Sequence, residues 1–514
     1  MVKKILTLLF LFPYIFLFSQ STYYVSTNGN NSYNGLSIDS AFATLQYAAD
    51  IISAGDSVIV LPGNYTGFDM RTSGYQNSQI VFKAYNGNVT IDNPNSVTPD
   101  GINIEEADWI TIDGFKVINQ PRAGIRIAVS DFVTIKNNTC TSNARWGIFT
   151  GFTDDILIEN NTCSYSGTEH GIYVSNSGDR PVVRNNTCFE NNGCGIQLNA
   201  DVSQGGDGII TNAVIEGNIL HDNCYNGGSA INLDGVQESE IYNNLLYNNH
   251  STGIALFQID GAEGSKNNKV YNNTILIPSD GRWAILVVDG STGDTLYNNI
   301  LINHHSFRGS IAIDPASVNG FCSDYNLVEN RLSNDDGETN MSLTEWQNLG
   351  YDNHSFLVDS EDQIFINSSS GNFYLIEASQ PVDIGTSNVL PIVNVDLDNI
   401  QRPQGNGYDI GAYEFYSPAE VKGFNHVTCF KLFQNYPNPF NPTTTISYTL
   451  AERSFVTIKV YNILGVEVKI LVNEEKPAGQ YETNFDGSKY ACGIYFYQFR
   501  AGEVVQTRKM VLIK

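Results

Sequence analysis

The stretch from Gly147 to Cys188, GIFTGFTDDILIENNTCSYSGTEHGIYVSNSGDRPVVRNNTC, holds the pattern that governs the fold. It contains the phrase Asn-Asn-Thr-Cys twice and the phrase Gly-Ile-x-apolar twice, and each phrase recurs after 24 or 25 residues. Short apolar segments separated by Asn and Gly turns, repeated at such an interval, are typical of a solenoid in which each repeat forms one coil.

The same two phrases continue on both sides of this stretch. The Asn-Asn slot begins at Asn137, Asn160 and Asn185, and more loosely at Gly217, Asn243, Asn272 and Asn298. The Gly-Ile slot begins at Gly101, Gly124, Gly147, Gly171, Gly195, Ala230, Gly253 and Ala284. β-Branched residues and glycines dominate these repeats, whereas a leucine-rich repeat would need regularly spaced leucines. We therefore predict an all-β right-handed parallel β-helix, with coils about 4.8 Å apart and a ladder of asparagines at one corner.

Three of the eight cysteines lie in the Asn-Asn slot, at Cys140, Cys163 and Cys188. Later coils hold Leu or Ile at the same place, so the slot takes a small buried hydrophobe. No CxxC or His-x-His spacing accompanies the cysteines, which disfavours zinc. We expect unpaired thiols in the core.

Both charge and the first residues bear on location. MVKKILTLLFLFPYIFLFSQ has two lysines before a short apolar run, which predicts a secretory signal peptide over residues 1–19 and an exported protein. The 28 basic and 54 acidic residues give a net charge of −26, which disfavours nucleic acid as a partner. Solubility outside the cell explains the acidity most simply, and calcium binding is the alternative.

Residues 20–100 are expected to form an N-terminal cap and the first coils. A helical pattern runs from Phe42 to Ile52, Gly55 ends it, and a strand follows over residues 57–61. This opening resembles right-handed β-helix proteins of the pectate-lyase-like superfamily, including family 9 pectate lyases and chondroitinase-B-like enzymes. The stretch 383–415 resembles the closing segment of exported bacterial β-helix proteins. The resemblance covers roughly residues 22–415 and implies a β-helix over 101–415. It does not imply one activity, because the superfamily mixes lyases, hydrolases, epimerases and non-enzymes.

The composition changes after Phe415. A linker over 416–427 leads into residues 428–514, which contain the Pro-rich phrase YPNPFNP and then alternating strands. This region resembles the C-terminal sorting domain of the type IX secretion system. The resemblance implies a small β-sandwich that the outer-membrane secretion machinery recognises, and a protein that is secreted or attached to the cell surface. A carbohydrate-binding β-sandwich is the alternative.

The solenoid predicts which side chains face outward. Side chains alternate along a strand, so the third and fifth residues of Gly-Ile-x-apolar-x point away from the core. One predicted column is Asn103, Arg126, Phe149, Tyr173, Gln197, Asn232 and Ala255, and the other is Glu105, Ala128, Gly151, Ser175, Asn199, Asp234 and Phe257. The middle coils form a polar strip with aromatic neighbours, which suits an extended sugar chain. Ordinary solvated strand faces are the alternative.

Two insertions sharpen this prediction. Residues 201–212 and 258–268 lengthen coils next to the strip, and such loops tend to build binding walls. We expect substrate contacts from Arg126, Phe149, Gln197, Asn199, Asn232, Gln258 and Asp260. His170 and Arg180 flank the Tyr173 strand, although Arg180 would alternatively form a turn salt bridge with Asp179.

Three functions remain open. A polysaccharide lyase needs a base, an acid and a group that neutralises the uronate, and His170, Tyr173 and Arg180 are the candidates for these roles in that order. The superfamily often pairs calcium with a Lys or Arg base, but no lysine lies between Lys136 and Lys266.

An inverting glycoside hydrolase would use Asp201 and Asp234. These two residues are one coil apart and about two residues apart along the strand, which corresponds to a distance of about 8 Å. Inverting enzymes separate their two carboxyl groups by roughly 6.5–9.5 Å. The same two carboxylates could hold calcium through waters, and the sequence names no other metal ligands. The third function is non-catalytic binding of polysaccharide at the cell surface. We predict a monomeric, exported, polysaccharide-active protein, with a lyase of acidic polysaccharide ahead of the other two.

Overall fold

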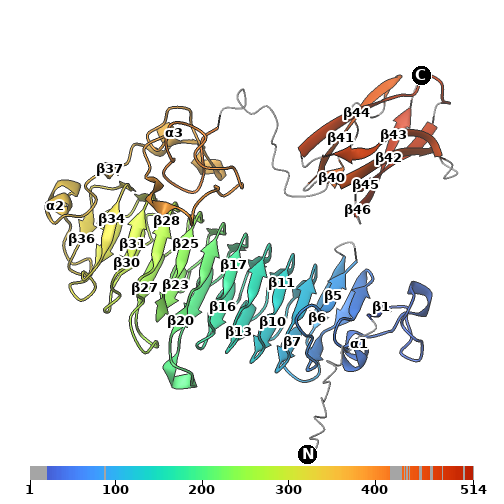
Figure 1. Ribbon diagram of the computed structural model, residues 1–514, viewed down its shortest axis with the longest axis horizontal. Coiled ribbons are helices and arrows are strands. Elements are labelled where there is room, and N and C mark those ends of the chain that lie inside the picture. The colour runs from blue at the N-terminus through green and yellow to red at the C-terminus, as the bar shows by residue number, and fades with distance from the viewer. Residues whose placement is uncertain are drawn as a thin grey trace, which may run out of the picture. The chain divides into compact units, whose positions relative to one another are not determined.

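The computed structural model describes residues 20–85 and 88–416, and residues 431–512 with short gaps (Figure 1). The expected signal peptide, and the expected linker apart from Tyr416, lie outside the described residues. The chain divides into two compact units whose boundary along the sequence follows Phe415, apart from the short stretch 398–401. Among the described residues, no helix is long and apolar enough to cross a membrane.

The first unit is a parallel β-helix of three sheets, named A, B and C here (Figure 1). Each coil contributes a strand to sheet C, then to sheet A, then to sheet B, before the chain returns to sheet C.

Sheet A contains β1 (Thr22–Val25), β2 (Ser57–Val60), β5 (Ile80–Ala84), β8 (Ile110–Asp113), β11 (Thr134–Lys136), β14 (Leu157–Glu159), β17 (Val182–Arg184), β21 (Val214–Glu216), β25 (Glu240–Tyr242), β28 (Lys269–Tyr271), β31 (Thr295–Tyr297) and β34 (Cys322–Asp324). Sheet B contains β3 (Gly63–Thr66), β6 (Val89–Asn93), β9 (Lys116–Ile118), β12 (Thr139–Thr141), β15 (Thr162–Ser164), β18 (Thr187–Phe189), β22 (Ile219–His221), β26 (Leu245–Tyr247), β29 (Thr274–Ile277), β32 (Ile300–Asn303), β35 (Leu327–Val328) and β37 (Phe356–Leu357). Sheet C contains β4 (Phe68–Met70), β7 (Ile102–Glu105), β10 (Ala123–Ala128), β13 (Trp146–Gly151), β16 (Ile172–Ser175), β19 (Ile196–Asn199), β23 (Ser229–Asp234), β27 (Thr252–Phe257), β30 (Ile285–Val287), β33 (Ile311–Ile313) and β36 (Leu332–Ser333). A short pair, β20 (Ile210–Thr211) and β24 (Val236–Gln237), follows the loop over residues 201–209, which is the first part of the predicted 201–212 insertion.

The predicted core thiols and asparagine ladder are confirmed. Cys140, Cys163 and Cys188 are fully buried, unpaired and in register on consecutive strands of sheet B. The ladder uses the asparagine at the second position of the Asn-Asn slot and ends at Asn326, and each amide nitrogen lies 3.0–3.1 Å from the amide oxygen of the next rung. Its members are Asn138, Asn161, Asn186, Asn218, Asn244, Asn273, Asn299 and Asn326. The residue before each ladder asparagine turns the chain with a positive φ, which Asn and Gly adopt most readily; it is Asn or Gly in every coil but the last, where it is Tyr325.

Both ends of the β-helix are covered. At the N-terminus, η1 (Ile38–Ser40) precedes α1 (Leu45–Ile51), which buries Leu45 and Ala48 against the first coils, as predicted. At the other end α2 (Leu343–Asn348) places Trp346 in the same core. The following segment packs on the outer face of sheet B through Phe365 and Phe373. Its elements are α3 (Glu361–Ile364), β38 (Phe365–Asn367), η3 (Ser368–Ser370), β39 (Asn372–Leu375) and η4 (Ser387–Val389).

The second unit is the predicted small β-sandwich. One antiparallel sheet contains β40 (Lys431–Leu432), β41 (Thr443–Leu450) and β44 (Gly479–Asp486), and the other contains β42 (Ser454–Asn462), β43 (Glu467–Lys476), β45 (Gly493–Ala501) and β46 (Val504–Leu512). Tyr448, Phe485, Tyr497 and Phe499 fill a core of its own between them.

Candidate functional site

The two predicted outward columns exist in the predicted register on sheet C. Arg126 pairs with Phe149, Phe149 with Tyr173, and Tyr173 with Gln197 along the first column. In the second column Ser175 pairs with Asn199, and Asn199 with Asp234. A one-residue slip would have reversed every side chain, so the Gly-Ile phrase fixed this face.

An aromatic cluster covers the middle of this face. The ring of Phe149 lies 4.6 Å from Trp146 and 5.5 Å from Tyr173, measured between ring centroids. Tyr173 also meets the imidazole of His170 edge to face at 5.1 Å. Two consecutive coils thus join their rings into one surface with a polar tip at Tyr173, the kind of surface on which a sugar ring stacks.

His170 is a neutral hydrogen-bond donor in this site. Its Nδ1 accepts the backbone N–H of Cys194 at 2.9 Å, so the ring proton lies on Nε2. Burial, helped by the positive charge of Arg145, lowers the pKa of His170 to about 4. At neutral pH its free nitrogen donates rather than accepts, so this tautomer disfavours the predicted role of His170 as base.

Tyr173 and Asp260 meet on one amide. The Nδ2 of Asn199 donates to the hydroxyl of Tyr173 at 3.2 Å and to the carboxylate of Asp260 at 3.1 Å. The two oxygen atoms therefore lie within about 6 Å of each other. Burial raises the pKa of Tyr173, which keeps its phenol protonated. The Oδ1 of Asn199 is buried without a hydrogen-bond partner in the described chain.

Sequence reasoning missed the groups that frame the rings. The carboxylate of Glu169 accepts from Trp146 Nε1 and Arg145 Nε, both at 2.7 Å, and the guanidinium of Arg145 lies over the Trp146 ring at 4.4 Å. Trp146 and His170 both directly precede the Gly of a Gly-Ile phrase. Alternation along the strand assigns the residue before Gly to the inward side together with Ile, so the pattern that predicted the two columns could not identify this position.

Asp234 does not occupy the exposed position that was predicted. Its side chain is buried, because the loop after β27 folds over it. Both carboxylate oxygens accept backbone N–H groups, from Ile259, Asp260 and Gly261, at 2.8–3.1 Å. Burial raises the pKa of Asp234. The carboxylate therefore anchors a loop, and its replacement by Ala would cost stability rather than leave it unchanged.

The Asp201 carboxylate is also engaged locally. One of its oxygens accepts the backbone N–H of Ser203 at 2.8 Å and the hydroxyl at 2.6 Å, as the cap of η2 (Val202–Gln204). With Asp234 bound to its loop, these two residues do not fit a calcium ion or an acid–base pair facing a sugar. Among the described residues, no group of three or more His, Cys, Asp or Glu side chains is arranged to hold a metal ion.

The two insertions lie against each other beyond the strip. Ala262 donates its N–H to Gly208 O at 2.9 Å, and Val202 donates to Asp260 O at 3.1 Å. Gln258 is turned into its own loop, where it donates to Gly261 O. The loops therefore cover the Ala230 coil, and Asn232, predicted to face a ligand, is buried.

The predicted arginines are paired with carboxylates. Arg126 binds Asn103 at 2.7 Å and Glu105 at 3.2 Å at the N-terminal end of the same face. Arg180 lies at the corner after sheet C, where it binds Asp154 and Asp155, each at 2.9 Å. Arg180 therefore forms a turn salt bridge, which was the alternative in the sequence analysis. Its partners are Asp154 and Asp155, and Asp179 lies farther away.

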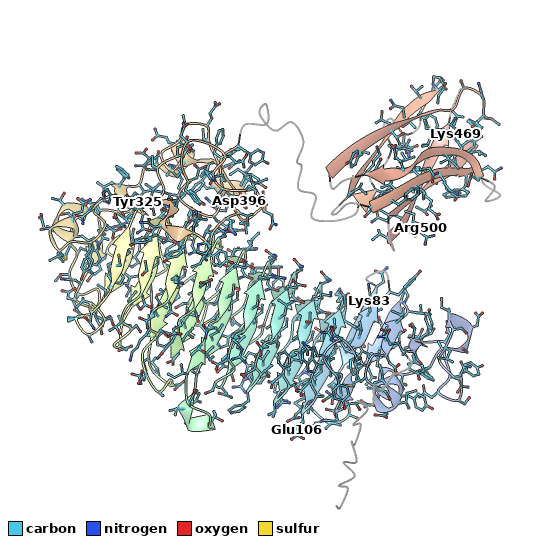
Figure 2. All side chains as sticks on the ribbon, viewed as in Figure 1. Lys83, Glu106, Tyr325, Asp396, Lys469 and Arg500 are labelled. Atoms are coloured by element: carbon cyan, nitrogen blue, oxygen red, sulfur yellow. The ribbon has the colours of Figure 1, made fainter. Side chains whose placement is uncertain are left out.

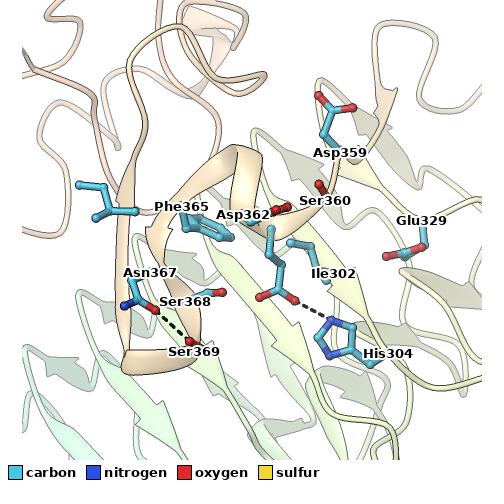
Figure 3. A pocket seen from close by; sticks show the side chains of 12 residues that line it. Ile302, His304, Glu329, Asp359, Ser360, Asp362, Phe365, Asn367, Ser368 and Ser369 are labelled. Atoms are coloured by element: carbon cyan, nitrogen blue, oxygen red, sulfur yellow. Dashed lines mark hydrogen bonds and ion pairs between the residues drawn. The ribbon is translucent and has the colours of Figure 1, made fainter.

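A separate cavity of about 490 Å³ lies beside the closing segment (Figure 3). His304 projects into it and forms a 2.5 Å ion pair with Glu361. This contact raises the pKa of His304 and lowers that of Glu361. None of the residues predicted for the site lines this cavity, whose walls are largely acidic and hydroxyl-bearing: Glu329, Asp359, Ser360, Asp362, Ser368 and Ser369.

Comparisons with known proteins agree with this architecture. Family models described as a right handed beta helix region and as a Pel9A-like right handed beta helix region match residues 100–275 and 23–171. A model of the secretion system C-terminal sorting domain matches residues 434–514. Comparison with curated protein sequences returns no match.

Among solved structures, pectate lyase Pel9A superposes with a TM-score of 0.53 at 17% identity, covering 77% of this chain and 96% of that one. An alginate lyase from Paenibacillus sp. str. FPU-7 gives a TM-score of 0.40 at 18% identity, covering 52% and 94%. A mannuronan C-5 epimerase module from Azotobacter vinelandii gives 0.37 at 18%, covering 53% and 91%. The protein is thus a right-handed parallel β-helix protein with a type IX secretion sorting domain, which directs it out of the cell or onto its surface.

Proposed function

We propose that this exported, polysaccharide-active protein binds a glycan along the outer face of sheet C and cleaves it as a lyase. The observation that carries the proposal is the meeting of Tyr173 and Asp260 on Asn199, directly beside the rings of Trp146 and Phe149. The pectate lyase with the same fold supports the class of substrate, an acidic polysaccharide.

Each group has a role in β-elimination. A sugar ring stacks on Phe149, and the Nε2–H of His170 donates to the uronate carboxylate, which stabilises the charge that develops there. Asp260, the exposed carboxylate, accepts the proton beside the uronate carboxylate. The protonated phenol of Tyr173 then donates its proton to the departing glycosidic oxygen as that bond breaks. The breaking C–O bond leaves a carbon–carbon double bond in the product.

The test is to incubate purified protein with polygalacturonate, alginate and neutral glucans, following ultraviolet absorbance of unsaturated ends alongside reducing ends. Tyr173→Phe should lower turnover by about 10²–10⁴-fold, because it removes the hydroxyl that supplies the transferable proton while it keeps the ring. Tyr225→Phe, at an exposed tyrosine elsewhere, is the matched control and should leave turnover unchanged. Full activity of Tyr173→Phe would refute the proposed role. Reducing ends without unsaturated product would identify a hydrolase.

Non-catalytic binding of polysaccharide is the second candidate. It is favoured by the pairing of Arg126 and Arg145 with carboxylates, which leaves neither arginine free for a uronate. Retention of a polysaccharide without any product would support it over the lyase.

A further inference from the structure

Exposed apolar side chains occupy the corner between sheets C and A on consecutive coils. Val129 and Phe152 directly follow β10 and β13, and Phe132 follows three residues after Val129. Their exposed fractions are 53%, 36% and 39%. Trp109, one coil before Phe132, stacks on its ring at 4.2 Å with the two planes 11° apart. Glu106, labelled in Figure 2, occupies the position equivalent to Val129 in the preceding coil.

These four residues adopt backbone angles that their side chains disfavour. Their φ values lie between +51° and +58°, a region that bulky and β-branched residues rarely enter. Backbone hydrogen bonds from coil to coil identify the equivalent slots. The slot of Val129 and Phe152 continues as Asn176, Ala200 and Gly235, and the slot of Trp109 and Phe132 continues as Asp155, Arg180, Asn212, Glu238, Asn267 and Gly293. Fold stability alone favours Asn or Gly here, so the rings at the first coils oppose the local backbone preference.

A ladder of aspartates runs beside the rings. Asp108 accepts the backbone N–H of Asp131, Asp131 that of Asp154, and Asp154 that of Asp179, at 2.8–2.9 Å. Arg180 pairs with Asp154 and Asp179, and the other two carboxylates of this ladder, Asp108 and Asp131, repel a polyuronate, an acidic membrane and a second copy of this chain, whose net charge is −26. They are good acceptors for sugar hydroxyls, while the C–H face of a sugar ring stacks on an aromatic ring.

We propose that Trp109, Val129, Phe132 and Phe152 form a binding platform for a neutral polysaccharide, separate from the Tyr173 face. The loop over residues 201–209 lies next to the platform. Gly206 is in this loop, and a Cβ atom placed there would lie 3.9 Å from the Phe152 ring and 2.7 Å from the Ser177 side chain. The platform holds the exported protein on a neutral glycan whatever chemistry Tyr173 performs, so the two proposals stand or fall separately.

The test uses the double variant Phe132→Asn/Phe152→Asn. Asn occupies the same slots in later coils, so the variant should fold and its melting temperature should hold or rise. Electrophoresis of the full protein through gels containing hydroxyethyl cellulose or galactomannan should show retardation of the parent. The double variant should need at least tenfold more polysaccharide for the same retardation. A gel that contains polygalacturonate is run in parallel, as the acidic polysaccharide.

Tyr165→Asn is the matched control, because Tyr165 is also an exposed aromatic residue with φ +56°, but at the corner after sheet B. It should be retarded like the parent, and so should Tyr173→Phe. Three outcomes would overturn the platform: no retardation in either neutral gel, equal retardation of the double variant, or a fall in its melting temperature beyond that of Tyr165→Asn. Binding of an oligolysine peptide in place of the neutral glycans, lost in the double variant, would overturn the assigned ligand.

Discussion

Asp294 shows at the scale of one residue how the stacked corners constrain charge. It is fully buried at the position that Asn268 occupies one coil earlier. One of its carboxylate oxygens accepts hydrogen bonds from the backbone N–H and the side-chain amide of Asn268. The other oxygen has no hydrogen-bond partner in the described chain. Burial raises the pKa of Asp294 from 3.8 to about 7. The folded protein therefore holds a proton that the unfolded chain releases between these values.

Asp294→Asn should remove a pH dependence. The proton retained by the folded state makes stability fall as pH rises from about 4 to about 7, and the full loss persists above that window. The variant should be more stable than the parent at pH 8, by on the order of 4 kcal/mol, and the difference should vanish toward pH 4. Thermal unfolding across this range checks it, with exposed Asp39→Asn as control. Parallel pH profiles of the variant and the parent would contradict the assignment.

At the scale of the element, the asparagine ladder joins every coil from Asn138 to Asn326. Each rung accepts the backbone N–H and the amide of the preceding rung, and its own amide also donates to a backbone carbonyl. All of these groups are buried, where an unmade hydrogen bond is costly. The ladder therefore determines the register of successive coils, and it also stabilises them.

Asn218→Ala should destabilise the β-helix by about 2–4 kcal/mol, because it strands the N–H groups of Asn186 and the carbonyl of Val183. Chemical denaturation of the purified protein measures the loss. Asn226→Ala, at an exposed asparagine nearby, should change the free energy of unfolding by less than about 0.5 kcal/mol. Equal effects of the two substitutions would show that the ladder does not stabilise the coils.

At the scale of the whole molecule, two units with separate cores serve separate tasks. The β-helix carries both candidate binding surfaces, and the β-sandwich carries the match to the secretion sorting domain. Because the two hydrophobic cores share no residue, removal of one should leave the fold of the other intact.

Deletion of residues 428–514 should therefore stop the protein from crossing the outer membrane while the β-helix stays folded. Cell fractionation would find the truncated protein in the periplasm, and its circular dichroism and melting temperature would match those of the β-helix in the parent. Normal release of the truncated protein into the medium would refute the role of this region in sorting.

The sequence by itself determined the coil and its faces. Phrases such as those at Gly147 and Asn160 repeat the same local choices, apolar inward and Asn or Gly at the turn, so local periodicity dictates both the fold and the outward columns. The sequence could not determine which outward side chains remain exposed and without a partner in the protein. The burial of Asp234, the tautomer of His170 and the pairing of Arg180 depend on loops and neighbouring coils 24 to 27 residues away along the chain. Those contacts follow from how irregular loops pack, which has no period to read, and so only the tertiary structure decided them.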